Sequence, residues 1–466
     1  MSRPALVRYT GLAGSLFLAA AAFRGGARSP SQPKVTLSTI FAGQSGVLLL
    51  LTWLLGTALL IGAWWFGRRA VPSARWAYVT AALWMLPLLP FLPLGSYDVY
   101  SYACQGWQQA AGLDPYAGGV DLLGCPWREA VAPTWRSSPA PYGPVFLLLA
   151  AAAAGLGGSL AGTVAALRVI ALLGVALVAV CLPMLARRAG VPLGRAVWLA
   201  LACPLVPIHL ISGAHNDAVM VGLLVAGLAA AAARRPAVAG VLLGLAIGVK
   251  ATAVVAVPFA LLAAWGGPRR TWRTAAELVG GLAGALAAAS LWSGRALGSV
   301  TGLAGSGVSV QWTSPPTAVG MAIDLIGPDA VPVTRVLGIL LLGAVLAALW
   351  WRARHGDPLL FAGYALAATV VLAPVLHPWY ATWPLVVLAA TLRRDTLWLV
   401  IPCAVAAALC LPNGYNLALA TKAQGALAMT ALVLYSAWKA LHEAKNQHRR
   451  RAEPAHVCDR LSGRDS

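Results

Sequence analysis

The chain has 466 residues, of which 59% are hydrophobic and only 10% are charged, and its mean hydropathy is +0.75. So few charged side chains cannot cover the surface of a soluble globular protein of this length, which excludes the soluble enzyme classes. The net charge of +20 does not indicate nucleic-acid binding, because the basic residues stand in short clusters between apolar runs. The composition therefore predicts a multi-pass membrane protein.

Apolar stretches that approach the length of a membrane crossing, about 20 residues, recur from Leu6 to Leu441. They are rich in Ala, Leu, Val and Gly, which suits close helix packing in lipid. We expect an all-α, polytopic transmembrane bundle of about 13 to 15 spans. The spans are expected near residues 6–23, 46–66, 76–94, 164–186, 196–213, 218–233, 236–249, 252–266, 275–292, 333–350, 358–376, 379–392, 396–412 and 423–441.

These spans form one domain, residues 1–441, and a basic, polar tail over residues 442–466 is expected to be disordered. The N-terminal span has the basic start and apolar core of a signal peptide. No small-residue cleavage site follows Phe23, so we expect it to remain uncleaved.

Lysine and arginine are concentrated on alternate connections between the expected spans. Because such clusters face the cytoplasm, both termini are predicted to be cytoplasmic in a plasma-membrane protein. The apolar piece 142–158 is interpreted as re-entrant or interfacial, since a full crossing there would invert every later connection. The clusters lie at residues 68–75, 187–195, 234–235, 269–273, 352–354, 393–394 and from Lys439 onward.

The first large outer loop, residues 95–141, begins with a carboxylate, Asp98, directly after an apolar run. Carboxylates at the edge of a membrane are unfavourable unless they are paired or hydrated, so they are candidates for function. We expect Asp98 to be a general base that accepts a proton from a sugar hydroxyl; the alternative is a solvated loop acid. The aromatic side chains around it are candidates for substrate binding: Tyr97, Tyr100, Tyr102 and Trp107.

Two further polar groups fall on the same outer side. His215, Asn216 and Asp217 lie between two spans and could bind sugar hydroxyls or a phosphate, or else cap the next helix. Lys250 stands between two apolar halves that are short for full spans. It is a candidate to bind a lipid phosphate, and the alternative is a lysine that extends to the membrane surface.

An aromatic turn, His377-Pro378-Trp379-Tyr380, ends a later span. We predict that His377, Trp379 and Tyr380 contact the substrate, with stacking of the aromatic rings on sugar. The alternative is that these aromatics mark the membrane interface, where Trp and Tyr gather.

No metal site is expected, because the outer loops contain no Asp-x-Asp, and no His-x-x-x-His or zinc-spaced cysteine pair is present. The sequence also lacks a glycine-rich phosphate loop, so neither ATP nor a sugar nucleotide is expected as a direct substrate. Cys104 and Cys125 share the first outer loop. They are compatible with a disulfide in an oxidising compartment or with two free thiols.

Several stretches in this order resemble the membrane-embedded GT-C glycosyltransferases. Within that class they resemble the polyprenol-phosphate-mannose-dependent α-(1→6)-mannosyltransferases of actinobacterial lipoglycan synthesis. The stretches are SYDVYSYACQGWQQAAGLDPY, PAPYGPVFLLL, ISGAHNDAVMVGLLVAGLA, GLAIGVKATAVVAVPFALL, QWTSPPTAVG and VLHPWYATWPL.

The resemblance implies that Asp98 is the catalytic acid group. It also implies a donor of mannose joined to a polyprenyl phosphate, a mannan or lipoglycan acceptor outside the membrane, and inversion at the sugar carbon without a metal or nucleotide. One departure from many related families is that Tyr97, rather than a second charged residue, precedes Asp98.

Three alternatives remain. The first is a transferase that uses another polyprenyl-phosphate sugar. The second is a lipid-linked sugar flippase or transporter, although we find no internal repeat and the polar clusters lie on one side. The third is an oligosaccharide polymerase or ligase, which is expected to carry a large arginine-rich outer loop, whereas residues 293–332 contain only Arg295.

Overall fold

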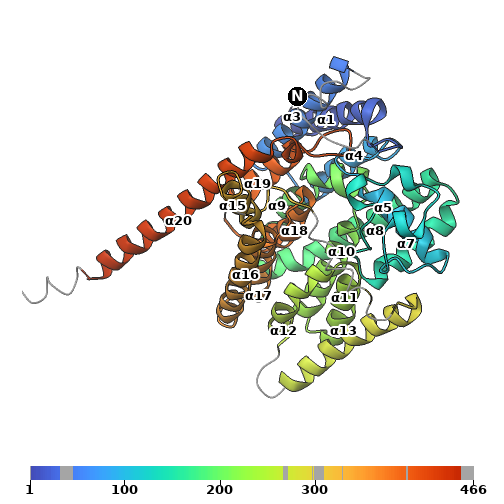
Figure 1. The fold of residues 1–466 in the computed structure, drawn as a ribbon. Coiled ribbons are helices and arrows are strands. Elements are labelled where there is room, and N and C mark those ends of the chain that lie inside the picture. The colour runs from blue at the N-terminus through green and yellow to red at the C-terminus, as the bar shows by residue number, and fades with distance from the viewer. Residues whose placement is uncertain are drawn as a thin grey trace, which may run out of the picture.

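The computed structural model describes residues 2–31, 46–265, 271–295, 298, 309–327, 329–394 and 397–452. Over these ranges the chain forms α-helices and short helical turns, and the only β pairing is an isolated bridge between Cys410 and Asn416. The all-α prediction is therefore confirmed. Figure 1 shows the helices gathered into one bundle from which the last helix projects.

The first helices pack tightly and then break before the site. Helices α1 and α3 touch at Gly14 and Gly56, where a Cβ on Gly56 would lie 2.9 Å from the Gly14 carbonyl oxygen. The predicted span 76–94 ends early, because three prolines, the first of them Pro87, lack the N–H that helix continuation needs. These elements are α1 (Arg3–Gly25), α3 (Gly46–Gly67), α4 (Ala74–Met85) and the turn η1 (Leu86–Leu88).

The first outer loop folds into helices of its own. Its last helix, α7, has 14 residues, which rise only about 21 Å against a hydrocarbon core of about 30 Å. Because α7 is too short to cross alone, its length is compatible with the predicted re-entrant or interfacial segment. The elements here are α5 (Asp98–Ala110), α6 (Val120–Leu123), η2 (Arg128–Ala130), η3 (Pro133–Trp135) and α7 (Pro144–Gly157).

The centre of the bundle is α10, nearly all of whose side chains are buried between α8 and α11. Helix α9 and the turn η4 that follows it are bent by 61° at their junction. Arg168 of α8 joins the end of η4 to the chain that follows η1, since its guanidinium donates to the carbonyls of Leu89, Phe91 and Ser212. The elements are α8 (Leu160–Ala189), α9 (Leu193–Leu201), η4 (Val206–Ser212), α10 (Asp217–Ala232) and α11 (Pro236–Val249).

The remaining helices complete the bundle and contribute the far wall of the site. Helix α20 continues eleven residues into the range 442–466 that was predicted to be disordered, and residues 453–466 lie outside the described residues. The elements are η5 (Ala251–Ala256), α12 (Val257–Ala264), α13 (Thr271–Ser293), α15 (Pro315–Ile323), α16 (Val331–Ala353), α17 (Pro358–Leu372), η8 (Pro378–Ala381), α18 (Thr382–Thr391), α19 (Leu397–Ala408), η9 (Leu417–Leu419) and α20 (Lys422–Ala452).

Among the described residues five helices are long and apolar enough to cross a membrane: α1, α3, α8, α13 and α16. The bent pair of α9 and η4 would make a sixth. Several other predicted spans, including α10, α11, α17 and α19, are shorter apolar helices. The multi-pass membrane character is confirmed, and the shorter helices arise where Pro, Gly or polar residues interrupt the apolar runs.

Candidate functional site

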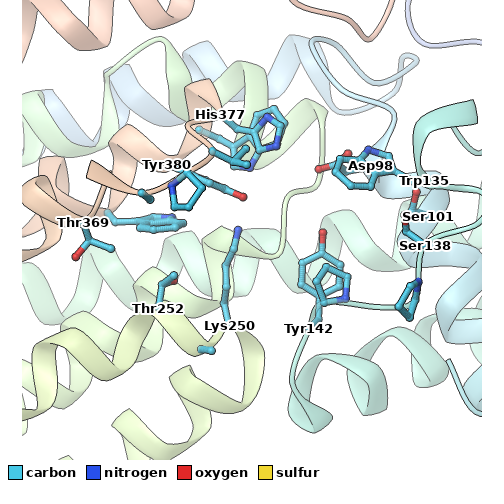
Figure 2. A pocket seen from close by; sticks show the side chains of 18 of the residues that line it. Asp98, Ser101, Trp135, Ser138, Tyr142, Lys250, Thr252, Thr369, His377 and Tyr380 are labelled. Carbon is cyan, nitrogen blue, oxygen red and sulfur yellow. The ribbon is translucent and has the colours of Figure 1, made fainter. Parts of the chain in front are cut away.

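A cavity of about 260 Å³ joins segments that are far apart in the sequence (Figure 2). One wall comes from α5 and the chain that precedes α7, and the other from η5, the end of α17 and the turn η8 with α18. Of the residues predicted from sequence, the cavity lining includes Asp98, Lys250, His377, Trp379 and Tyr380.

Asp98 is the first residue of α5 and points into the cavity. Its amide donates a hydrogen bond to the Ser96 hydroxyl at 3.0 Å, which fixes the start of the helix. The side chain is only 15% exposed. Burial raises the pKa of Asp98 to about 6, because an ionised carboxylate is poorly solvated there. A carboxylate with such a pKa is suited to accept a proton near neutral pH.

The rotation of α5 decides which of its side chains reach the cavity. Successive residues of an α-helix are about 100° apart, so Ser101 and Gln105 share the face of Asp98, and all three line the cavity. Tyr100 and Trp107 lie about opposite to Asp98 on the helix.

The four aromatic residues predicted around Asp98 do not line the cavity: Tyr97, Tyr100, Tyr102 and Trp107. The Tyr100 hydroxyl instead donates to the Ala27 carbonyl at 2.6 Å. The Tyr97 ring packs against Tyr415, with 5.2 Å between ring centroids. Tyr97 and Tyr100 anchor α5 to the rest of the bundle, and Trp107 lies off the cavity face; a part for them in substrate binding stays a prediction.

Behind Asp98 lies His215, which is fully buried. Its Nδ1 is 3.8 Å from an Asp98 carboxylate oxygen and 3.2 Å from the Tyr102 hydroxyl, and its ring stacks on Trp379 at 3.9 Å. Burial holds the pKa of His215 well below its usual range, so the ring is neutral and its approach to Asp98 is not an ion pair. Tyr102 and His215 thus support Asp98 from outside the cavity lining.

Asn216 and Asp217, predicted as sugar or phosphate ligands, are buried and do not line the cavity. The alternative of a side-chain helix cap is not formed at Asn216, since its side chain makes no capping hydrogen bond. Asp217 Oδ1 accepts from Lys250 Nζ at 2.9 Å and from the Trp383 indole N–H at 2.6 Å. Asp217 is therefore the buried counter-ion of Lys250.

Lys250 stands at the break between α11 and η5, where the sequence placed it between two short apolar helices. Its ammonium lies 4.2 Å from the centroid of Tyr380 and 5.0 Å from that of Trp383. Nearby, the segment that carries Tyr142 crosses the end of α11 at Gly143. A Cβ at Gly143 would lie 2.3 Å from the Gly248 carbonyl oxygen, so the two segments can approach this closely only with glycine at position 143. This contact places the two walls of the cavity against each other.

The turn at His377 faces inward. Trp379 is only 5% exposed, and the rings of His377 and Trp379 are stacked 4.6 Å apart. Tyr380 stacks on Trp383 at 4.4 Å. Because these rings line the cavity rather than the outer surface, the alternative of a membrane-interface belt does not describe them.

Several residues that line the cavity escaped the sequence prediction. Trp135, Ser138 and Tyr142 come from one proline-rich segment of the first outer loop, and this polar aromatic composition beside Asp98 was the available signal. For Ser101 and Gln105 the signal was helical spacing, since they lie one and two turns after Asp98 on the same face of α5. No local signal marks the others, which packing brings to the cavity from later parts of the chain: Thr252, Thr369 and Trp383.

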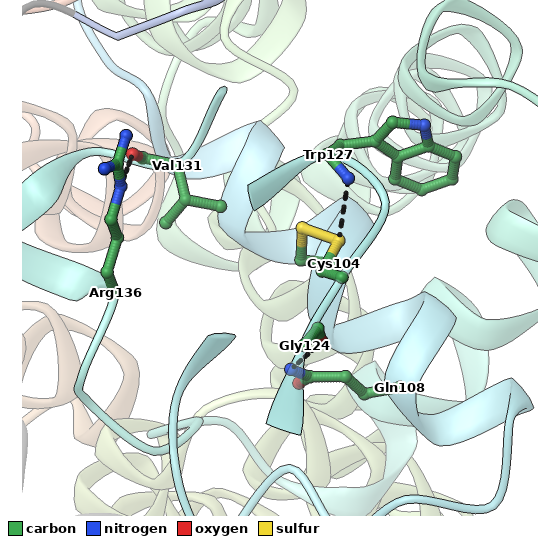
Figure 3. The surroundings of a disulfide bond; sticks show 7 residues. Cys104, Gln108, Gly124, Trp127, Val131 and Arg136 are labelled. Atoms are coloured by element: carbon green, nitrogen blue, oxygen red, sulfur yellow. Dashed lines mark hydrogen bonds between the residues drawn. A yellow bond between two sulfur atoms is a disulfide. The ribbon is translucent and has the colours of Figure 1, made fainter. Parts of the chain in front are cut away.

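Cys104 and Cys125 form a disulfide, so the structure favours that alternative over two free thiols (Figure 3). The Trp127 amide donates to the Cys125 sulfur at 3.3 Å, and the Gln108 side chain donates to the Gly124 carbonyl at 3.0 Å. The disulfide and the Gln108 hydrogen bond fasten the outer loop to α5. Over the described ranges, no three His, Cys, Asp or Glu side chains gather closely enough to hold a metal ion.

Comparison with known proteins identifies the chain's relatives. Residues 8–266 match the family model of the α-(1→6)-mannopyranosyltransferase N-terminal domain, and residues 315–439 match the MptB C-terminal domain. Alpha-(1->6)-mannopyranosyltransferase A of Mycobacterium tuberculosis is 34% identical over 410 residues, which cover 81% of this chain and 79% of that protein.

Two further relatives have similar names. A probable α-(1→6)-mannopyranosyltransferase of Mycolicibacterium smegmatis is 30% identical over 83% of this chain and 79% of its own length. Alpha-(1->6)-mannopyranosyltransferase B of Corynebacterium glutamicum is 32% identical over 70% of this chain and 60% of its own. No solved structure matches the chain. The predicted resemblance is confirmed at the level of the family: the chain is a glycosyltransferase that belongs to the α-(1→6)-mannopyranosyltransferase family.

Proposed function

We propose that this glycosyltransferase moves mannose from polyprenyl-phosphate-mannose to a mannan or lipoglycan acceptor and forms an α-(1→6) bond with inversion. The names of its relatives support mannose and the linkage. The observation that carries the proposal is a single cavity with the Asp98 carboxylate and the Lys250 ammonium in its lining. A general base and a cation are the groups that a displacement at a sugar phosphate requires.

The reaction is a single displacement. The acceptor hydroxyl oxygen forms a bond to the anomeric carbon of mannose while the bond from that carbon to the phosphate oxygen breaks. Asp98 accepts the hydroxyl proton, and the polyprenyl phosphate leaves with the electron pair. A β-linked donor gives an α-linked product by this route.

Lys250 is suited to stabilise the charge that develops on the leaving phosphate. It is the only Lys or Arg among the described residues that line the cavity. Its ammonium has three donors, and one of them is used by Asp217. The other two remain for phosphate oxygens, so the positive charge is held in place before the reaction begins.

We also propose that the cavity faces the extracytoplasmic side of the plasma membrane, with both termini in the cytoplasm. The support is the distribution of basic residues on alternate connections. A C-terminal fusion to green fluorescent protein is expected to fluoresce, and a fusion to alkaline phosphatase at the same position is expected to be inactive. The reverse pattern would place the C-terminus outside. We further propose that neither a metal nor a nucleotide takes part, since the Lys250 ammonium supplies the positive charge that the leaving phosphate needs.

The decisive experiment uses purified protein, synthetic polyprenyl-phosphate-mannose and a short α-mannoside. Wild-type protein is expected to form product, and Asp98→Asn is expected to lower kcat by at least about a hundredfold, as for the loss of a general base. Retained activity in folded Asp98→Asn would remove Asp98 from the mechanism. Product with another polyprenyl-phosphate sugar but not with mannose would show that the enzyme transfers that other sugar. A folded wild type that transfers no polyprenyl-phosphate sugar would overturn the proposed donor class.

A further inference from the structure

We propose that Ser101, Gln105, Trp135 and Ser138 form a subsite for the acceptor sugar at the Asp98 end of the cavity. The ligand class is an α-linked mannoside whose attacking hydroxyl reaches Asp98. This inference rests on the proposed function and adds to it the place where the acceptor binds.

The first support is a pair of polar atoms without a partner. Ser101 Oγ and Gln105 Oε1 are buried, line the cavity and have no hydrogen-bond partner among the described residues. Buried polar atoms are almost always hydrogen-bonded, because an unmet donor or acceptor is unfavourable. Both atoms belong to the α5 face that carries Asp98. A sugar hydroxyl can both donate and accept a hydrogen bond, so it is a suitable partner for Ser101 Oγ and for Gln105 Oε1.

The second support is the Trp135 ring. It is half-buried, lines the cavity, and packs at its back against a small cluster of Cys104, Val120 and Val131. The disulfide partner Cys125 lies against the same cluster. A rigid aromatic surface with a few placed polar groups is typical of a small-ligand pocket, and a sugar presents an apolar C–H face to such a ring.

The third support is the direction of the reaction. In a single displacement the acceptor approaches the anomeric carbon from the side opposite to the leaving phosphate. If Lys250 binds the phosphate, the acceptor must lie toward the other end of the cavity. Figure 2 shows Ser101, Trp135 and Ser138 grouped with Asp98 at that end, away from Lys250 and Thr252. Trp135 and Ser138 are joined by a backbone hydrogen bond of 3.2 Å, which fixes their spacing.

The test separates the KM for the acceptor from the KM for the donor. Trp135→Leu is expected to raise the acceptor KM by about tenfold or more, the equivalent of about 1.4 kcal/mol, while the donor KM changes less than about twofold. Trp135→Phe should recover much of the loss, because a ring remains. The matched control is Trp272→Leu, an 88% exposed tryptophan on α13, which should change neither constant.

Gln105→Leu provides a second variant of the subsite. It is expected to raise the acceptor KM several-fold, about the effect of one hydrogen bond, with the donor KM unchanged. Its unchanged donor KM would show that the fold is intact. An acceptor KM that stays at the wild-type value in both Trp135→Leu and Gln105→Leu, with transfer active, would overturn the subsite and leave the proposed function standing.

A direct binding measurement keeps the two proposals distinguishable. If wild-type protein transfers no mannose, the proposed function fails, and binding of an α-(1→6)-mannotrioside is measured by saturation-transfer NMR. Binding that is lost in Trp135→Leu and kept in Trp272→Leu would still support the subsite. Equal binding in wild type and Trp135→Leu, or none in wild type, would overturn it.

Discussion

The two ends of the cavity each depend on a buried carboxylate, and the two carboxylates have opposite surroundings. Asp98 faces the cavity, has the neutral His215 as a neighbour at 3.8 Å, and has its pKa raised to about 6. Asp217 is fully buried behind the wall and is held by Lys250 at 2.9 Å and Trp383 at 2.6 Å. The comparison teaches that burial alone does not define a reactive acid. Asp98 keeps its oxygens for a proton, whereas Asp217 uses one of them to hold a cation in place.

Removal of the cation is expected to have the largest effect. Lys250→Met should lower kcat by about 10² to 10³, the usual range for loss of one group that stabilises developing negative charge. It should also lower the free energy of unfolding by about 3–5 kcal/mol, since Asp217 is left as an unpaired buried charge. Transfer assays and denaturant unfolding measure the two effects.

The double variant Lys250→Met/Asp217→Asn separates these effects. Removal of both charges should restore much of the lost stability, because no uncompensated charge remains in the interior. Activity should stay as low as in Lys250→Met. If the double variant regains both stability and activity, Lys250 has only a structural part.

The counter-ion itself is expected to have a smaller effect than the catalytic acid. Asp217→Asn should lower activity by about tenfold, about 1.4 kcal/mol, by allowing the Lys250 ammonium to leave its position, and the donor KM should rise. Asp98→Asn should lower kcat and leave the donor KM near its wild-type value. Equal kinetic profiles for the two variants would contradict the difference drawn between the two acids.

The raised pKa of Asp98 predicts a pH profile. Asp98 must be ionised to accept a proton, so kcat should rise about tenfold per pH unit up to about pH 6 and then level off. The folded protein binds this proton more tightly than the unfolded chain, so the contribution of Asp98 to stability should fall as the pH rises from about 4 to about 6. Residual activity in Asp98→Asn should lack the step at pH 6; a step that persists there would assign it to another group.

The disulfide is expected to have the smallest kinetic effect. The replacement of Cys104 and Cys125 together by Ala should lower the free energy of unfolding by about 2–4 kcal/mol. Looser support of Trp135 should raise the acceptor KM a few-fold and leave the donor KM unchanged. A shift in the donor KM alone would show that the outer loop serves the other end of the cavity.

Much of the site was predictable because its key residues are polar side chains that lie within apolar segments or at their ends. Asp98 follows an apolar run, Lys250 interrupts one, and the His377 turn ends one, and each such departure within a membrane segment indicates function. The residues around Asp98 were chosen by their aromatic side chains and not by helical spacing. Ser101 and Gln105, on the Asp98 face of α5, were therefore missed, whereas Tyr100 and Trp107 lie on the opposite face.

The sequence by itself determined the class of the protein. Apolar runs of this length and number belong in a membrane, and there they form helices, because a helix satisfies the hydrogen bonds of its own backbone. It also indicated the break at Lys250 between two short apolar helices, but not the breaks within the expected spans 76–94 and 196–213. Only the tertiary structure decided which of the interrupted helices have their ends side by side in the bundle. Asp217 and Trp383 are 166 residues apart, yet one hydrogen bond joins them, and from behind the wall Asp217 holds the Lys250 ammonium at one end of the cavity. Such pairings depend on packing between helices, which local periodicity does not encode.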